Sequence, residues 1–97
     1  MMKKVKEAVK PFDPDVDVIL FGSRARGDYR EQSDWDFLIL TSMKIDWRKK
    51  REIHNAIFCV ELDTSAAISP LIYSKPEWET QVVTDIYKNI AEEGVQL

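Results

Sequence analysis

Four apolar residues in a row, Phe37 to Leu40, constrain the fold of this chain more than any other feature of its sequence. They belong to the segment 34–41, Asp-Trp-Asp-Phe-Leu-Ile-Leu-Thr, whose composition predicts a β-strand. Successive side chains of a strand point to opposite faces of a sheet, so both faces are apolar beyond Asp36. Such a strand lies in the interior of a sheet that helices cover on at least one side. The sequence therefore predicts an α/β fold.

Two further segments complete the predicted sheet. Residues 16–21 are β-branched and aromatic, and Gly22 ends that strand. Residues 66–73 form the third strand, where Pro70 indicates an edge strand or a bulge because proline cannot donate a ladder hydrogen bond. We expect a small mixed β-sheet of about three or four strands with flanking helices, in a single domain over residues 1–97.

Three helices are predicted around this sheet. The first covers residues 1–12, the second runs from the N-cap Asp46 to about Cys59, and the third runs from the capping box of Ser74 and Glu77 to Gly94. The positions expected to face the core are Trp47, Ile53, Ile57, Trp78, Val82, Ile86 and Ile90. Glu92 and Glu93 lie in the last turn of the third helix, where the helix dipole disfavours acids, so they require solvent exposure or a partner.

The composition is that of an ordinary globular domain, with 97 residues, 44% hydrophobic and 32% charged, and a net charge of −3. The single cysteine, Cys59, has apolar neighbours that predict a buried thiol in a reducing compartment. No run approaches the roughly 20 apolar residues of a membrane span. No apolar segment follows the basic N-terminus, so no signal peptide is expected. We expect a cytoplasmic protein with no membrane association.

The charges are unevenly distributed along the chain. Residues 1–51 hold 12 basic and 9 acidic residues, whereas residues 52–97 hold 2 basic and 8 acidic ones. The overall acidity, with a pI of about 5.1, argues against independent nucleic-acid binding. The basic run Arg48–Arg51 and the only histidine, His54, are therefore expected on a solvated helix face.

The pair Gly22-Ser23, at the end of the first strand, is a candidate phosphate-binding turn. Glycine lets another group approach the backbone closely, and a serine that caps a following helix leaves free N–H groups for an anion. Taken alone, the pair is more often an ordinary strand–helix turn.

Asp34 and Asp36 strengthen the case for a functional site. They stand two residues apart in a predicted strand, so their carboxylates point to one face of the sheet, where like charges repel. Mg²⁺ suits such a pair because it binds one or two protein carboxylates and takes its other ligands from water and substrate phosphates. An exposed strand start is the alternative, and the buried run that follows Asp36 opposes it.

Gly22-Ser23, ten intervening residues, and then Asp34-Trp35-Asp36 resemble the signature of the polymerase-β-type nucleotidyltransferase superfamily, most closely its minimal nucleotidyltransferase (MNT) members. The resemblance implies the polymerase-β-like nucleotidyltransferase fold. It also implies that Gly22 and Ser23 bind the nucleotide triphosphate and that Asp34 and Asp36 are catalytic and hold two Mg²⁺ ions. Arg26 matches an arginine that contacts phosphate oxygens in several members, and Arg24 is a further candidate for such a contact.

One feature departs from the family pattern. The family usually supplies a third carboxylate from the next strand, but residues 66–73 contain no acid. Ser69 stands at the corresponding position, while Glu61 and Asp63 lie upstream and could reach the site only if the strand began earlier. Loss of one carboxylate would weaken metal binding and slow the reaction.

The resemblance implies a Mg²⁺-dependent nucleotidyltransferase that moves a nucleoside monophosphate, AMP from ATP, onto a hydroxyl. Minimal members resemble the antitoxin half of toxin–antitoxin pairs whose partner is a HEPN-domain ribonuclease, so a partner tyrosine would be the acceptor. The alternative is an inactive module that neutralises a HEPN-type partner by contact; the absent third acid favours it and the aspartate pair opposes it. An Asp-x-Asp glycosyltransferase is disfavoured because those folds generally exceed a single small domain.

Overall fold

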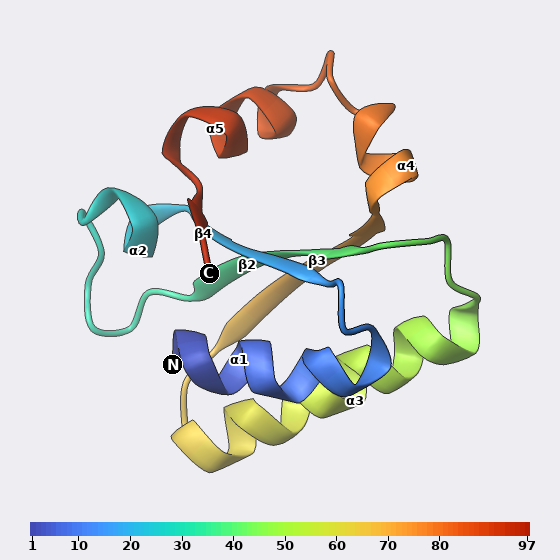
Figure 1. Cartoon of the computed structure of the whole chain (residues 1–97). Coiled ribbons are helices and arrows are strands. Elements are labelled where there is room, and N and C mark those ends of the chain that lie inside the picture. Colours follow the sequence, from blue (N-terminus) through green and yellow to red (C-terminus); the bar gives the residue numbers. More distant parts are fainter.

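A four-stranded mixed sheet forms the centre of the structure, a computed structural model that describes residues 1–97 (Figure 1). Its strands are β1 (Asp17–Phe21), β2 (Trp35–Thr41), β3 (Ile68–Ser74) and β4 (Val95–Gln96), in the order β3-β2-β1-β4. β1 pairs antiparallel with β2 and β4, and β2 pairs parallel with β3. The apolar strand β2 therefore has a neighbour on each side, and β3, which contains Pro70, is an edge strand, as predicted.

Helices cover both faces of this sheet (Figure 1). They are α1 (Met2–Val9), the 3₁₀ turn η1 (Lys10–Phe12), α2 (Ser23–Arg26), α3 (Trp47–Thr64), α4 (Lys75–Glu79) and α5 (Asp85–Glu93). α1 and α3 lie on one face, and α4 and α5 lie on the other. No helix combines the length and the apolar character needed to cross a membrane.

The face under α1 and α3 carries the larger core. Val18 and Leu20 of β1 alternate with Ile19 and Phe21, so each strand sends every second side chain to this face. The buried cluster comprises Val5, Val9, Val16, Val18, Leu20, Phe37, Ile39, Ile53, Ile57, Val60, Ile68 and Ile72. Burial of Ile53 and Ile57 confirms the predicted inner face of α3.

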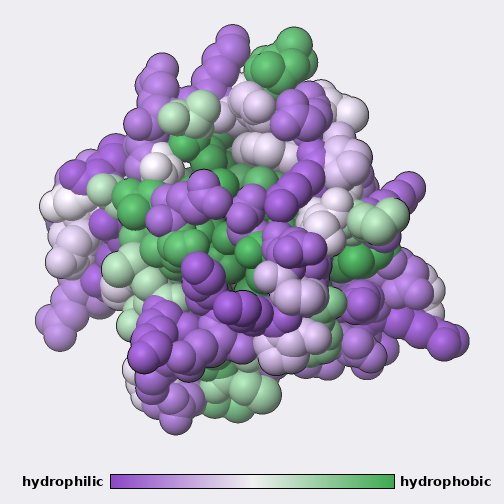
Figure 2. All heavy atoms as spheres, viewed as in Figure 1, coloured by the Kyte–Doolittle hydropathy of each residue, from purple (hydrophilic) through white to green (hydrophobic).

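The opposite face carries a smaller core, in which Leu38 and Leu40 of β2 pack with Trp78 of α4 and Ile90 of α5. The Trp78 ring stacks on Tyr87, with 5.0 Å between ring centroids, and thereby joins the two helices. Figure 2 shows apolar atoms between the layers of the molecule under a mainly polar surface. The two faces of β2 are thus buried by different pairs of helices.

The prediction of one continuous third helix is wrong, because the chain forms two short helices in that region. The capping box at Ser74 is present, with Glu77 N–H donating to Ser74 Oγ at 3.2 Å, but α4 ends at Glu79. A second cap, Thr84 Oγ1 accepting from Tyr87 N–H, begins α5. The β-branched residues Val82 and Val83 lie between them and are exposed, against the prediction for Val82.

Three predictions for α3 also need correction. The helix extends to Thr64 rather than Cys59, and it ends where Ser65 adopts a left-handed conformation with φ of 57°. Cys59 is exposed, and so is Trp47, because the inward stripe of α3 passes through Ile53, Ile57 and Val60. Apolar neighbours in the sequence therefore did not indicate burial of the thiol.

Phe37 and Phe58 provide a test of the core. Phe37 is fully buried in the larger cluster, whereas Phe58 is 56% exposed on α3. We expect Phe37→Ala to lower the free energy of unfolding by about 3–5 kcal/mol because it leaves a cavity. Phe58→Ala should change it by less than about 0.5 kcal/mol. Urea denaturation followed by circular dichroism measures both, and equal losses would contradict the assigned core.

Candidate functional site

Four of the five predicted site residues line one cavity of about 550 Å³ at the end of β1. Gly22, Ser23 and Arg26 come from the turn after β1 and from α2, and Asp36 comes from β2. The opposite wall belongs to α5, through Asp85, Ile86, Asn89 and Glu93. The fifth residue, Asp34, immediately precedes β2 and lies beside this cavity without lining it.

Gly22 is required at this position for two physical reasons. Its φ is +77°, in the region that residues with a Cβ rarely adopt. A Cβ built there would also overlap Oδ2 of Asp36, since the last residue of β1, Phe21, pairs with Asp36. The glycine therefore allows the backbone of the turn to lie directly against the Asp36 carboxylate.

Ser23 does not cap the next helix, which corrects the role we expected for it. Gly22 is the N-cap of α2, Ser23 is the first helical residue, and no side chain caps the turn. α2 has only four residues, so its dipole is small and the turn offers an anion its backbone N–H groups, the Ser23 hydroxyl and the Arg26 guanidinium.

The two aspartates differ in their surroundings. Asp34 Oδ2 accepts a hydrogen bond of 3.1 Å from Ser69 Oγ and is exposed. Asp36 is half-buried, and burial raises the pKa of its carboxyl, with a further rise from the negative charge of Asp34 and an opposing effect from Arg26. A cation between the two carboxylates would relieve both the burial cost and the repulsion.

No third carboxylate joins this pair. Glu61 accepts a hydrogen bond from Ile68 N–H at 3.3 Å, and Asp63 pairs with Lys4 at 2.7 Å on the α1–α3 side. Neither acid reaches the site. Ser69 pairs with Asp36 in the β2–β3 register, so a serine stands beside the aspartates. No three Asp, Glu, His or Cys side chains gather in an arrangement that could hold a metal ion.

The donor set still fits Mg²⁺ in the presence of a nucleotide. Asp34 and Asp36 supply the one or two carboxylates that Mg²⁺ takes from a protein, and phosphate oxygens and water would fill the other positions. Burial, the main cause of the raised pKa of Asp36, and the neighbouring charge of Asp34 would both be offset by a bound cation.

Arg26 is engaged by acids in this structure. Its Nη1 donates to Oε1 and Oε2 of Glu93 at 3.2 and 3.1 Å, and its Nε donates to Oδ2 of Asp28 at 3.2 Å. These contacts raise the pKa of the Arg26 guanidinium, Glu93 more than Asp28. Glu93 Oε1 also accepts from Gly22 N–H at 3.3 Å. Glu93 is a site residue that the sequence did not identify; its only signal was an acid at an unfavourable helix end.

The Arg24 guanidinium, a further candidate for a phosphate contact, binds the chain itself in this structure. Its guanidinium donates to the carbonyls of Ser33 and Glu31, with Nη2 distances of 3.1 and 3.0 Å. It also lies over the rings of Tyr29 and Trp35, at 4.3 and 4.4 Å from their centroids. Arg24 therefore fixes the loop that leads from α2 to the aspartates.

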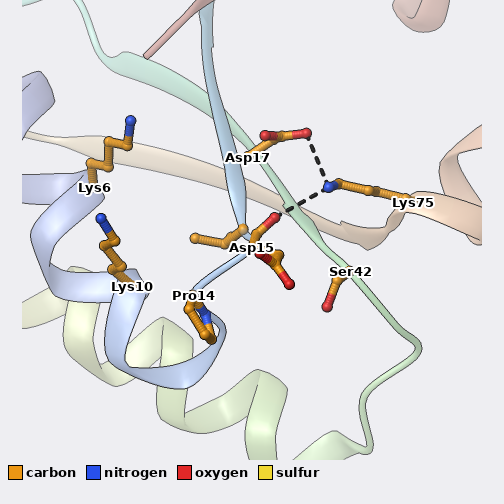
Figure 3. Close-up of a pocket in the computed structure, with 8 residues that line it drawn as sticks. Lys6, Lys10, Pro14, Asp15, Asp17, Ser42 and Lys75 are labelled. Carbon is orange, nitrogen blue, oxygen red and sulfur yellow. Dashed lines mark hydrogen bonds and ion pairs between the residues drawn. The ribbon is translucent and has the colours of Figure 1, made fainter.

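A second cavity, of about 570 Å³, lies at the start of β1, the opposite end of that strand from Gly22 (Figure 3). It contains three lysines, but Lys75 pairs with Asp17 at 3.3 Å, and Lys6 donates to the carbonyl of Leu97 at 2.7 Å. Figure 3 shows Lys75 directed toward Asp15 and Asp17, with Lys6 and Lys10 apart from these acids. None of the predicted site residues lines this cavity, so we do not assign it as the phosphate site.

The fold is that of the polymerase-β-like nucleotidyltransferases. The profile of the family described as "Nucleotidyltransferase domain" matches residues 2–96. The chain therefore belongs to the nucleotidyltransferase domain family, as the two motifs predicted.

Two relatives come from Methanocaldococcus jannaschii. "Putative protein adenylyltransferase MJ0141" is 38% identical over 81 residues, which span 74% of this chain and 82% of the relative. "Putative protein adenylyltransferase MJ0604" is 31% identical over 77 residues, which span 79% of this chain and 72% of the relative.

Solved toxin–antitoxin structures share the fold. One, a toxin–antitoxin with AMP-PNP, matches with a TM-score of 0.70 and 17% identity, over 98% of this chain and 70% of that chain. A mutant of the toxin–antitoxin MntA-HpeT matches with a TM-score of 0.69 and 14% identity, over 99% and 71% of the two chains.

Gly22 and Gly27 form a matched pair for testing the turn. Both have positive φ, 77° and 88°, but a Cβ at Gly27 meets nothing within 4 Å. Alanine at either position should cost about 1–3 kcal/mol of unfolding free energy because of backbone strain. We expect Gly22→Ala to cost at least about 1 kcal/mol more. Adding Asp36→Ala should recover part of that excess in a double-mutant cycle. Equal losses at the two glycines would contradict the close approach of Asp36.

Proposed function

We propose that this chain is a Mg²⁺-dependent adenylyltransferase that moves AMP from ATP onto a hydroxyl of a partner protein, as an MNT-type antitoxin. The observation that carries the proposal is the convergence of Gly22, Ser23, Arg26 and Asp36 on one cavity. The two archaeal relatives are named as protein adenylyltransferases, and a toxin–antitoxin with AMP-PNP has the same fold. These comparisons support ATP as the nucleotide and a toxin as the partner.

The chain's own residues would divide the work of binding. The Gly22 N–H, the Ser23 hydroxyl and the Arg26 guanidinium would bind phosphate oxygens of the nucleotide. Asp34 and Asp36 would hold Mg²⁺, with Ser69 orienting the Asp34 carboxylate through its hydrogen bond. When bound, Mg²⁺ lowers the pKa of an attacking hydroxyl and neutralises charge that develops on the phosphates.

In the proposed reaction the acceptor hydroxyl loses its proton to solvent and its oxygen forms a bond to the α-phosphorus. The bond from that phosphorus to the oxygen that bridges the α- and β-phosphates breaks, and pyrophosphate leaves. The rim residues Asp85, Ile86 and Asn89 of α5 are exposed. A hydroxyl on another protein can therefore approach along α5. We propose a tyrosine of a HEPN-type protein as the acceptor and the cytoplasm as the location of the pair.

A second function, neutralisation of the partner by contact alone, is favoured by one observation. Only the Asp34 and Asp36 carboxylates are placed to share a metal ion, and Ser69 takes the position that an acid would fill on β3. Two carboxylates would give weaker metal binding and a slower transfer than three. The half-buried Asp36 favours catalysis, because contact alone does not require two repelling carboxylates on one face.

Transfer of a radioactive label distinguishes the two functions. The chain is incubated with Mg²⁺, the protein encoded beside it and ATP labelled at either the α- or the γ-phosphate. We expect label on the partner from α-labelled ATP only, and its loss by at least about 100-fold in Asp34→Ala/Asp36→Ala. Glu52→Ala, which removes an exposed acid of α3 on the other side of the sheet, is the control. Equally low transfer by the unaltered chain and the double variant, with partner binding intact, would establish the contact-only function.

Ser69→Asp tests the proposed position of the third acid. Without Mg²⁺, a third like charge beside Asp34 should lower the melting temperature by a few degrees. With Mg²⁺ and ATP, the variant should gain more in melting temperature than the unaltered chain, because three carboxylates bind the ion more tightly. Ser65→Asp, at the exposed end of α3, is the control. Identical Mg²⁺ responses in both variants would show that residue 69 does not face the metal site.

A further inference from the structure

We propose that the Glu93 carboxylate occupies the polyphosphate subsite of the cavity and must leave it when a nucleotide binds, so that Glu93 sets the affinity of the site for polyphosphate. The inference rests on the proposed function in one respect, that the cavity takes a nucleotide phosphate. It adds an internal competitor to that site and identifies the residue that provides it.

The contacts of Glu93 are those of a bound anion. Glu93 Oε1 accepts from Gly22 N–H at 3.3 Å, and both carboxylate oxygens accept from Nη1 of Arg26, at 3.2 and 3.1 Å. Gly22 N–H and Arg26 are the groups that the nucleotidyltransferase motif offers to phosphate. The carboxylate thus uses donors that a phosphate would need, and one set of donors cannot serve both anions at these distances.

Burial shows that this contact is more than a surface ion pair. The Glu93 side chain is only 20% exposed, against 46% for Arg26. A carboxylate that loses this much water is stable only if hydrogen bonds compensate it, and Gly22 and Arg26 supply them. The same contacts explain why an acid is tolerated in the last turn of α5, where the helix dipole disfavours it.

The side chain can leave the subsite without unfolding α5. Ile90 lies three residues before Glu93, is buried in the smaller core, and holds the helix on the sheet. A rotation about the Glu93 side-chain bonds would therefore move its carboxylate toward solvent while the helix stays in place. A triphosphate carries more charge than one carboxylate and makes more contacts, so it can displace Glu93 from donors they share.

The adjacent residue provides a matched control. Glu92 carries the same charge on the same helix turn but is exposed and makes no contact with Gly22 or Arg26. Glu92→Gln and Glu93→Gln change the net charge equally. Any difference between them therefore reports the position of the carboxylate and not the overall charge.

The experiment measures tripolyphosphate binding to the full chain by titration calorimetry, without Mg²⁺. We expect Glu93→Gln and Glu93→Ala to bind tripolyphosphate about fivefold to tenfold more tightly than the unaltered chain, and Glu92→Gln to stay within about twofold. In the unaltered chain, the Gly22 amide resonance should shift during the titration, a measurement that does not depend on any variant folding.

Three results would overturn the inference. The first is equal affinity for tripolyphosphate in the Glu92 and Glu93 variants. The second is weaker binding after removal of Glu93, which would indicate that Glu93 only ties α5 to the turn. The third is no binding of tripolyphosphate to any variant. The label-transfer assay keeps the proposed function separate. Tighter tripolyphosphate binding without label transfer would support the role of Glu93 and contradict catalysis. Label transfer with equal affinities would support catalysis and contradict the role of Glu93.

Discussion

The approach of the Gly22 backbone to the Asp36 carboxylate is the contact on which the site depends. It exists because β1 and β2 are antiparallel neighbours, with the end of one beside the start of the other. That pairing brings a turn with free backbone donors next to an aspartate that can hold a cation. In the proposed complex, the phosphates and the metal ion would therefore be bound by residues of two neighbouring strands. The helices contribute mainly by burying the two faces of β2, the strand that carries Asp36.

The proposed metal site has one carboxylate fewer than its superfamily usually provides. The structure shows which groups surround the two aspartates that remain. Ser69 keeps a hydrogen bond to Asp34 but contributes no charge. Asp36 then lies half-buried with Asp34 as its main charged neighbour and Arg26 as a partial counter-charge. Arg26 is itself held by Glu93 and Asp28. Without nucleotide, the Arg26 guanidinium is thus shared among acids around the cavity, and in our proposal a polyphosphate has to displace Glu93 from it.

Much of this could be predicted from the sequence, for reasons that are local. The apolar run after Asp36, the capping box at Ser74 and the proline of β3 each act within a few residues, so they indicate the interior strand, a helix start and an edge strand correctly. What failed involves tertiary contacts. The break between α4 and α5 depends on a second cap and on Trp78 and Tyr87 stacking, and Glu93 reaches Gly22 across 71 positions of sequence.

The contacts of Arg24 with the rings of Tyr29 and Trp35 explain why ten residues separate the two parts of the motif. One side chain of α2 holds the return path of the loop through the carbonyls of Glu31 and Ser33. The loop between α2 and β2 therefore has the length that lets the Arg24 side chain reach its far end. An inserted residue would have to bulge away from this clamp or slide the start of β2 by one position, which would turn the aspartates to the opposite face. The number of residues between the two parts of the motif therefore determines where the aspartates lie relative to the Gly22 turn.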